Sequence, residues 1–194
     1  MTRALHWLAM AALPLLASCG HSPQTHLLTL DMAPPAARAS YAGPPVRLTA
    51  VQIPSAIDRL EYVSAVSPNE LRVQDQYRWS ASLGSLARGA LLRDLAERLP
   101  TGAVLPPDSP ATKGTRRVDV AILALTQTAE RSSMDVIITV AVDGGPQVLR
   151  HQVTVTRDHP PRLTPAEAAG DTSYLLGQVA DEITVLLGQM KAPA

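Results

Sequence analysis

The only cysteine of the 194-residue chain, Cys19, is the residue that first indicates chemistry. A cysteine thiolate can attack an electrophile, ligate a metal or accept a covalent modification. A single cysteine forms no intramolecular disulfide, and Cys19 lacks the second thiol of a redox pair. The five histidines show no metal-ligand spacing such as H-E-x-x-H. We therefore expect no disulfide, no metal site and no cofactor, and a covalent modification of Cys19 is the remaining chemistry.

The segment before Cys19 has the three-part plan of a secretory signal. Arg3 supplies a positive charge, an apolar stretch covers residues 8–16, and small residues follow. The stretch is too short for a mature membrane-spanning helix, which needs about 20 apolar residues. We predict that residues 1–18 are a signal peptide that is removed.

The four residues Leu16-Ala17-Ser18-Cys19 resemble the bacterial lipobox at every position. The resemblance implies that the Cys19 thiol takes a diacylglyceryl group as a thioether and that its new amino group is acylated. Each acyl methylene buried in the bilayer contributes about 0.8 kcal/mol to membrane binding. One acyl chain therefore binds reversibly, whereas several chains anchor a protein permanently. The alternative is a plain signal peptide with cleavage elsewhere and a leftover thiol.

Gly20, directly after the cysteine, is the residue that indicates to which membrane the lipoprotein is sorted. In proteobacterial lipoproteins, Asp at this position favours retention at the inner membrane. By resemblance to that rule, Gly20 predicts the outer membrane, with the domain on its periplasmic face.

Composition indicates one domain without a strong electrostatic preference. The chain has 17 basic and 17 acidic residues, so no net field favours nucleic acid. The apolar fraction of 46% is sufficient for a core, and the absence of Phe means that Leu, Val, Ile and Ala must build it.

Proline content divides the mature chain. Five prolines lie among Ala, Ser and Gly before Val46, which indicates an extended tether over residues 19–45, with one short strand at 26–30. The globular domain is predicted over residues 46–191. A tether of about 20 residues spans on the order of 25 Å as a coil, so the domain could stand off the lipid surface.

Strand patterns occur in two groups. The first group covers residues 46–53, 62–66 and 71–74, with a turn signal between the last two, and a short edge strand is expected at 103–105. The second group, 116–128, 133–142 and 147–156, forms a meander, and Asp143-Gly144-Gly145-Pro146 is its strongest turn signal.

Each group of strands precedes a helical pattern. Residues 80–99 place Leu and Ala, together with Asp94, at helical spacing. The charged residues lie mostly on the other side of the predicted helix: Arg88, Arg93, Glu97 and Arg98. Thr164 and Glu167 predict a capping box at the start of a second helix that runs to about residue 190. We predict a single α/β (α+β) domain, a mixed and mostly antiparallel sheet packed by two long helices.

Sequence motifs for catalysis are absent. The chain has no G-x-S-x-G elbow, no phosphate-binding P-loop and no G-x-G-x-x-G after a strand. A hydrolase assembled from separate residues such as Ser55, Asp58 and His151 is formally conceivable, since triads are defined by geometry. Most such residues are ordinary surface positions, and we expect no enzyme activity.

One stretch, residues 51–99, carries a family resemblance. A strand runs into Pro54, an apolar residue precedes Asp58-Arg59, a short hairpin follows, and its second strand ends in Arg78-Trp79 before a Leu-rich helix. This order resembles the ABC-type transport auxiliary lipoproteins of the PqiC type. Residues Leu60-Glu61-Tyr62 depart from it, because many members have Pro and Gln there, and the C-terminal half matches in pattern alone.

The resemblance implies a non-enzymatic subunit of an MCE-type lipid transport system that helps to maintain envelope integrity. Its partners would be a periplasmic MCE-domain protein and, within the system, an inner-membrane ABC ATPase and permease. The alternative is a lipid-anchored structural or assembly factor of another envelope or secretion complex. Whether copies of the chain bind each other stays open.

Partner contacts would use a modest mixed patch. Its expected residues are Asp58, Arg59, Tyr77, Arg78 and Trp79, because Arg and aromatic side chains are enriched at interface hot spots. Trp79 has a second interpretation, as a packing residue that precedes the first long helix.

Overall fold

The computed structural model describes residues 24–35, 37–67, 69–110, 112–161 and 164–190. Cys19 and Gly20 lie outside these ranges, so lipid attachment and sorting stay predictions. In chain order the elements are β1 (His26–Leu28), β2 (Val46–Gln52), β3 (Glu61–Ser67), β4 (Glu70–Trp79), α2 (Leu83–Arg98), β5 (Arg116–Gln127), β6 (Arg131–Val142), β7 (Val148–Asp158) and α3 (Pro165–Gln189).

The larger sheet has the strand order β2-β5-β6-β7. β2 lies parallel to β5, whereas β5, β6 and β7 form an antiparallel meander. Along β6 every second residue from Met134 to Val140 is buried, because successive side chains of a strand point to opposite faces. Gly144 has φ 73° in the turn between β6 and β7, which confirms the predicted hairpin.

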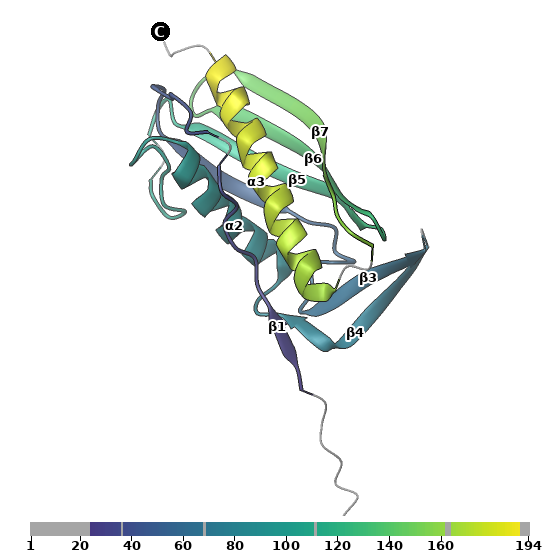
Figure 1. The fold of residues 1–194 in the computed structure, drawn as a ribbon. Coiled ribbons are helices and arrows are strands. Elements are labelled where there is room, and N and C mark those ends of the chain that lie inside the picture. Colours follow the sequence, from purple (N-terminus) through teal and green to yellow (C-terminus); the bar gives the residue numbers. More distant parts are fainter. Residues whose placement is uncertain (1–23, 36, 68, 111, 162–163, 191–194) are drawn as a thin grey trace, which may run out of the picture.

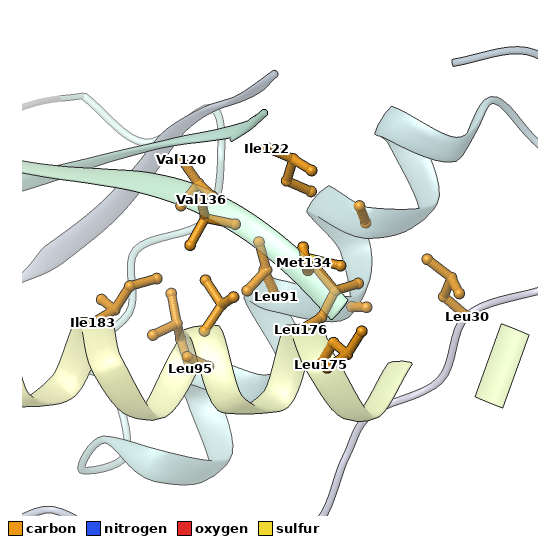
Figure 2. Close-up of a cluster of buried hydrophobic side chains, with 14 of the residues drawn as sticks. Leu30, Leu91, Leu95, Val120, Ile122, Met134, Val136, Leu175, Leu176 and Ile183 are labelled. Carbon is orange, nitrogen blue, oxygen red and sulfur yellow. The ribbon is translucent and has the colours of Figure 1, made fainter. Parts of the chain in front are cut away.

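Both helices cover one face of the larger sheet (Figure 1). Figure 2 shows Leu91 and Leu95 of α2 packed with Leu175, Leu176 and Ile183 of α3 against side chains of β5 and β6. The start of α3 is the predicted capping box: the Glu167 amide donates to Thr164 Oγ1 at 3.3 Å, and the Thr164 amide donates to Glu167 Oε2 at 2.8 Å.

The smaller sheet has the order β1-β4-β3. β3 and β4 form an antiparallel hairpin, and β1 pairs with β4 in parallel, placing His26 beside Tyr77 and Leu28 beside Trp79. The hairpin extends away from the helices and the larger sheet (Figure 1). The predicted strand at 103–105 is reduced to an isolated bridge between Val104 and Val46.

The α+β class is confirmed, with mixed pairing and two long helices around one core. The strands divide between two sheets because β1 pairs with β4, whereas β2 pairs with β5.

The segment after β1 differs from the predicted tether. We call residues 29–35 and 37–41 the strap, because they lie across α2 and α3. Two residues of the strap, Leu30 and Ala33, are buried, and Figure 2 shows Leu30 beside the helices. The Asp31 amide donates to Ser173 Oγ at 3.1 Å, and the Ala39 amide donates to the Arg98 carbonyl at 2.9 Å. Apolar burial and these hydrogen bonds make the strap part of the domain.

A buried ion cluster fastens the strap to both helices. Arg98, 1% exposed, places Nε 2.6 Å from Asp181 Oδ1 on α3 and Nη1 3.4 Å from Asp94 Oδ1 on α2. Arg98 Nη1 also donates to the Ala33 carbonyl at 3.2 Å, while the Ala33 amide donates to Asp94 Oδ1 at 2.9 Å. The prediction that Arg98 lies on the polar side of the helix is therefore wrong, because the strap and α3 bury it.

Candidate functional site

The predicted interface residues gather around the smaller sheet, and the structure adds Glu61 to them. Arg59 Nε lies 3.0 Å from Glu61 Oε2, and Arg78 Nη2 lies 3.5 Å from Glu61 Oε1. The side chains of Arg59, Arg78 and Glu61 are 47%, 52% and 32% exposed, respectively. Hydrogen bonds from the Glu61 backbone amide and from Arg59 lower the pKa of the Glu61 carboxyl. We call these three residues the ion cluster.

Asp58 has a local structural role next to the ion cluster. Its Oδ1 accepts a hydrogen bond from the Gly84 amide at 2.8 Å, in the first turn of α2. A side chain at position 84 would bring its Cβ 3.2 Å from both carboxylate oxygens, so glycine leaves the space that Asp58 occupies. Asp58 therefore caps α2 and fixes the loop that carries Arg59.

The two aromatic candidates differ in accessibility. The Tyr77 ring stacks on the His26 ring with centroids 5.1 Å apart, at the junction of β1 and β4. Trp79 is only 5% exposed and packs against Tyr62 with ring centroids 5.8 Å apart. The packing interpretation of Trp79 is confirmed. Its assignment to a partner interface is wrong, because its side chain points into the core.

An apolar groove separates the β3–β4 hairpin from the body of the domain. The room inside it that a water-sized molecule could occupy is only about 40 Å³. The lining residues are Ile57, Tyr62, Val63, Ala65, Leu71, Trp79, Leu83, Leu125, Gln127 and Thr172. Sequence reasoning missed this groove, although the alternation of Val63 and Ala65, and of Leu71 and Val73, signals one apolar face of the hairpin.

Hydrogen bonds close the inner end of this groove. Tyr62 donates its hydroxyl proton to Gln127 Oε1 at 3.1 Å, and Gln127 Nε2 donates to the Ala168 carbonyl at 2.9 Å. Burial raises the pKa of Tyr62 to about 12, so the phenol stays a neutral donor. These bonds join the hairpin to β5 and to the start of α3.

A second polar cluster contains the residue types of a hydrolase. Asp171 Oδ2 accepts from Ser132 Oγ at 2.9 Å and lies 3.6 Å from His159 Nε2, and Asp171 Oδ1 lies 3.2 Å from Arg157 Nη1. A nucleophilic Ser needs the His as its base, whereas here both side chains face the carboxylate. Ser132 is fully buried. The cluster therefore holds α3 against β6 and β7.

Ser55, Asp58 and His151, the triad considered from the sequence, share no hydrogen-bond network within the described residues. Asp58 caps α2, and His151 Nε2 lies 3.8 Å from Glu182 Oε2 on α3. Within the described residues, no three His, Cys, Asp or Glu side chains come together in a way that could hold a metal ion.

Comparison with known proteins identifies the family. The family model of the ABC-type transport auxiliary lipoprotein component matches residues 26–184, which begin at β1 and end within α3. The chain belongs to this family. The match shows that the auxiliary lipoprotein domain includes β1 and the strap, in agreement with their packing. The resemblance carried by residues 51–99 is thereby confirmed.

Solved structures share the auxiliary lipoprotein fold. One, described as an uncharacterized protein, superposes with a TM-score of 0.66 at 14% identity, over 84% of this chain and 99% of its own. Protein XCC0632 from Xanthomonas campestris, of family DUF330, superposes with a TM-score of 0.63 at 15% identity, over 86% and 97%. At these identities the likeness shows the fold alone. A search of curated proteins finds no match.

Membership makes this auxiliary lipoprotein a component associated with an ABC transport system and with a membrane. None of the helices in the described part of the chain is long and apolar enough to cross a membrane.

Proposed function

We propose that this auxiliary lipoprotein is the outer-membrane-anchored, periplasmic subunit of an MCE-type ABC lipid transporter. The family match over residues 26–184 carries the proposal, because it begins only seven residues after the lipobox cysteine. Its role is non-enzymatic: it binds the MCE-domain protein, and through it the ATPase and permease, and supports envelope integrity. Residues 20–25 leave little chain between the lipid and the domain.

The experiment is affinity purification of the anchored protein from membranes, with mass spectrometry of the bound proteins. The proposal expects an MCE-domain protein in the eluate and a detergent-sensitive envelope after deletion of the gene. Recovery of a secretion or assembly complex in its place, with unchanged detergent sensitivity, would support the alternative of an assembly factor.

Cys19→Ser is expected to abolish membrane anchoring, because a hydroxyl does not replace the thiolate in thioether formation. Fractionation should find the variant as a soluble protein or an uncleaved precursor. Ser18→Ala keeps a small residue before the cysteine and is the matched control, which should fractionate like the wild type. A mature outer-membrane species of the Cys19→Ser protein would contradict the lipobox assignment.

The ion cluster is the proposed contact for the MCE-domain protein. Arg59 and Arg78 both face solvent and share one carboxylate, so each guanidinium keeps donors for a partner. We expect the double variant Arg59→Ala/Arg78→Ala to lower recovery of the MCE-domain protein several-fold. Arg131→Ala is the control, because Arg131 forms an exposed ion pair with Asp158 on the larger sheet. Equal recovery with both variants would exclude the ion cluster as the contact.

A further inference from the structure

The two sheets of the described residues have four outer strands, and three of them have protected edges. Proteins protect such edges by shortness, charge or cover, because unpaired amides and carbonyls can bind another strand. β1 has only three residues, and β7 carries charged side chains such as that of Arg150. On β2, the Val46 amide donates to the Ala103 carbonyl at 2.8 Å. Arg88 Nη1 donates to the Thr49 carbonyl of the same strand at 2.7 Å, so β2 is covered.

The fourth outer strand, β3, has none of these protections. It belongs to the hairpin that projects from the body of the domain (Figure 1), and among the described strands it pairs only with β4. It has seven residues and no charged residue or proline after Glu61. Its pairing with β4 is regular from Tyr62 to Ala65. In an antiparallel pair only alternate residues bond to the neighbour, so the others direct their amides and carbonyls outward, where an added strand could bind them.

The groove beside β3 provides a place for one side chain of an added strand. Val63 and Ala65 of β3 line it together with Leu125 of the body, and its room of about 40 Å³ suits a single aliphatic side chain. The polar lining residue Gln127 has its amide oxygen and nitrogen bonded within the protein. When a strand joins a sheet edge, backbone hydrogen bonds supply affinity and pockets for alternate side chains supply specificity. The groove therefore selects an apolar side chain.

The opposite face of the hairpin selects the charge of the added strand. Arg72 of β4 lies opposite Ser64 of β3, one position away from the groove-lining residues and therefore on the other face. Its side chain is exposed and forms no ion pair with another described residue. Only β3 separates Arg72 from an added strand, a distance of about 10 Å that an arginine and a glutamate side chain span together. An acidic side chain on the added strand would complete this pair.

Charge also argues against a second copy of the chain as the occupant. Glu61 is the only carboxylate on β3, and it already contacts Arg59 and Arg78 of its own copy. β1 carries no acidic residue. The β3 or β1 edge of a second copy would therefore leave Arg72 without a carboxylate, and a different protein must supply the strand.

We propose that the outer edge of β3 binds an extended segment of the protein partner, with an apolar side chain in the groove and an acidic side chain beside Arg72. The inference rests on the proposed function and deepens it, because it gives the mode by which the partner is bound. The edge continues the ion cluster, since β3 begins at Glu61.

The test titrates the full lipidated protein in detergent micelles against a fluorescein-labelled peptide of alternating valine and glutamate, as long as the seven residues of β3. Fluorescence anisotropy should show saturable binding. Two further peptides are N-methylated, one at every valine and the other at every glutamate. Successive amides of a strand point to opposite edges, so only one of these two peptides should lose binding. Equal binding of both, or no binding of the unmethylated peptide, would overturn the proposal.

Variants of the protein locate the bound peptide. Arg72→Ala should weaken binding several-fold, and Ala65→Trp should weaken it by filling the groove. Arg150→Ala is the control, because Arg150 is also exposed and without an ion pair but lies on β7, and it should bind the peptide like the wild type. Thermal unfolding checks that each variant folds. Equal affinities for Arg72→Ala and Arg150→Ala would contradict the assigned charge contact.

Co-purification of the MCE-domain protein is scored separately from peptide binding. Peptide binding that fails while the MCE-domain protein is still recovered overturns this inference and leaves the proposed function in place. Edge-specific peptide binding without recovery of the MCE-domain protein supports the inference and contradicts the proposed function.

Discussion

Replacing Arg98 with methionine is expected to lower the free energy of unfolding by about 3–5 kcal/mol near neutral pH. Arg98 is buried, and its guanidinium contacts carboxylates of α2 and α3 and the carbonyl of Ala33 in the strap. Methionine fills much of the same volume but leaves Asp94, which is 0% exposed, without its cation. Equilibrium urea unfolding measures the difference.

Arg38→Met is the matched control for this prediction. Arg38 also pairs with a glutamate, Glu97, at 3.4 Å, but the two side chains are 71% and 44% exposed. An exposed pair contributes at most about 1 kcal/mol, so this variant should be close to the wild type. Similar decreases in the free energy of unfolding for Arg98→Met and Arg38→Met would contradict the role assigned to the buried cluster.

The loss caused by Arg98→Met should depend on pH. Burial raises the pKa of Asp94 to about 6, while the Ala33 amide and Arg98 act in the opposite direction. A folded-state pKa above the unfolded one means that the folded protein gains stability as the pH falls through about 6 towards about 4. Without Arg98 the pKa of Asp94 rises further. The deficit of the variant relative to the wild type should therefore shrink between about pH 8 and about pH 5.

Local patterns in the sequence predict the elements well but not their long-range pairing. The period-two burial of β6, the turn at Gly144 and the capping box at Thr164 each depend on neighbours within a few residues. The parallel pairing of β1 with β4 joins segments about 50 positions apart in the chain, and no local signal specifies it. The division of the strands into two sheets therefore appears only in the structure.

The strap shows how composition can mislead. Its prolines and alanines are typical of a tether, yet three of the residues between β1 and Pro34, among them Leu30 and Ala33, are buried or hydrogen-bonded to the helices. The same contacts explain the burial of Arg98, since the strap and α3 together cover that side of α2. Helical periodicity describes which face a residue occupies, but not which other segment covers the face.

The candidate site was predictable in part. Arg59 and Arg78, which the residue types predicted in one patch, both contact Glu61, and that this patch binds a partner stays a prediction. Their bridge, Glu61, was missed because it sits where the sequence departs from the family pattern. Two interpretations of the sequence placed Trp79 on the surface and in the core, and its 5% exposure and its packing against Tyr62 decide for the core.

Gly177→Ala is expected to lower the free energy of unfolding by about 1–3 kcal/mol, although alanine is the better helix former. The strap crosses α3 at this glycine. A Cβ at position 177 would lie 2.5 Å from the Ala33 Cβ and 3.2 Å from Arg98 Nη2, so the strap or the helix must shift. The shift disturbs the hydrogen bonds that Ala33 makes with Asp94 and Arg98.

Gly170→Ala provides the matched control on the same helix. A Cβ at position 170 meets nothing within 4 Å, so the variant should gain up to about 1 kcal/mol from helix propensity alone. The two Gly→Ala changes are therefore expected to have opposite signs in urea unfolding. Adding Ala33→Gly to Gly177→Ala removes the clashing methyl, and the double variant should be more stable than the sum of the two single changes predicts. Additive effects would show that the strap does not press on α3 at this position.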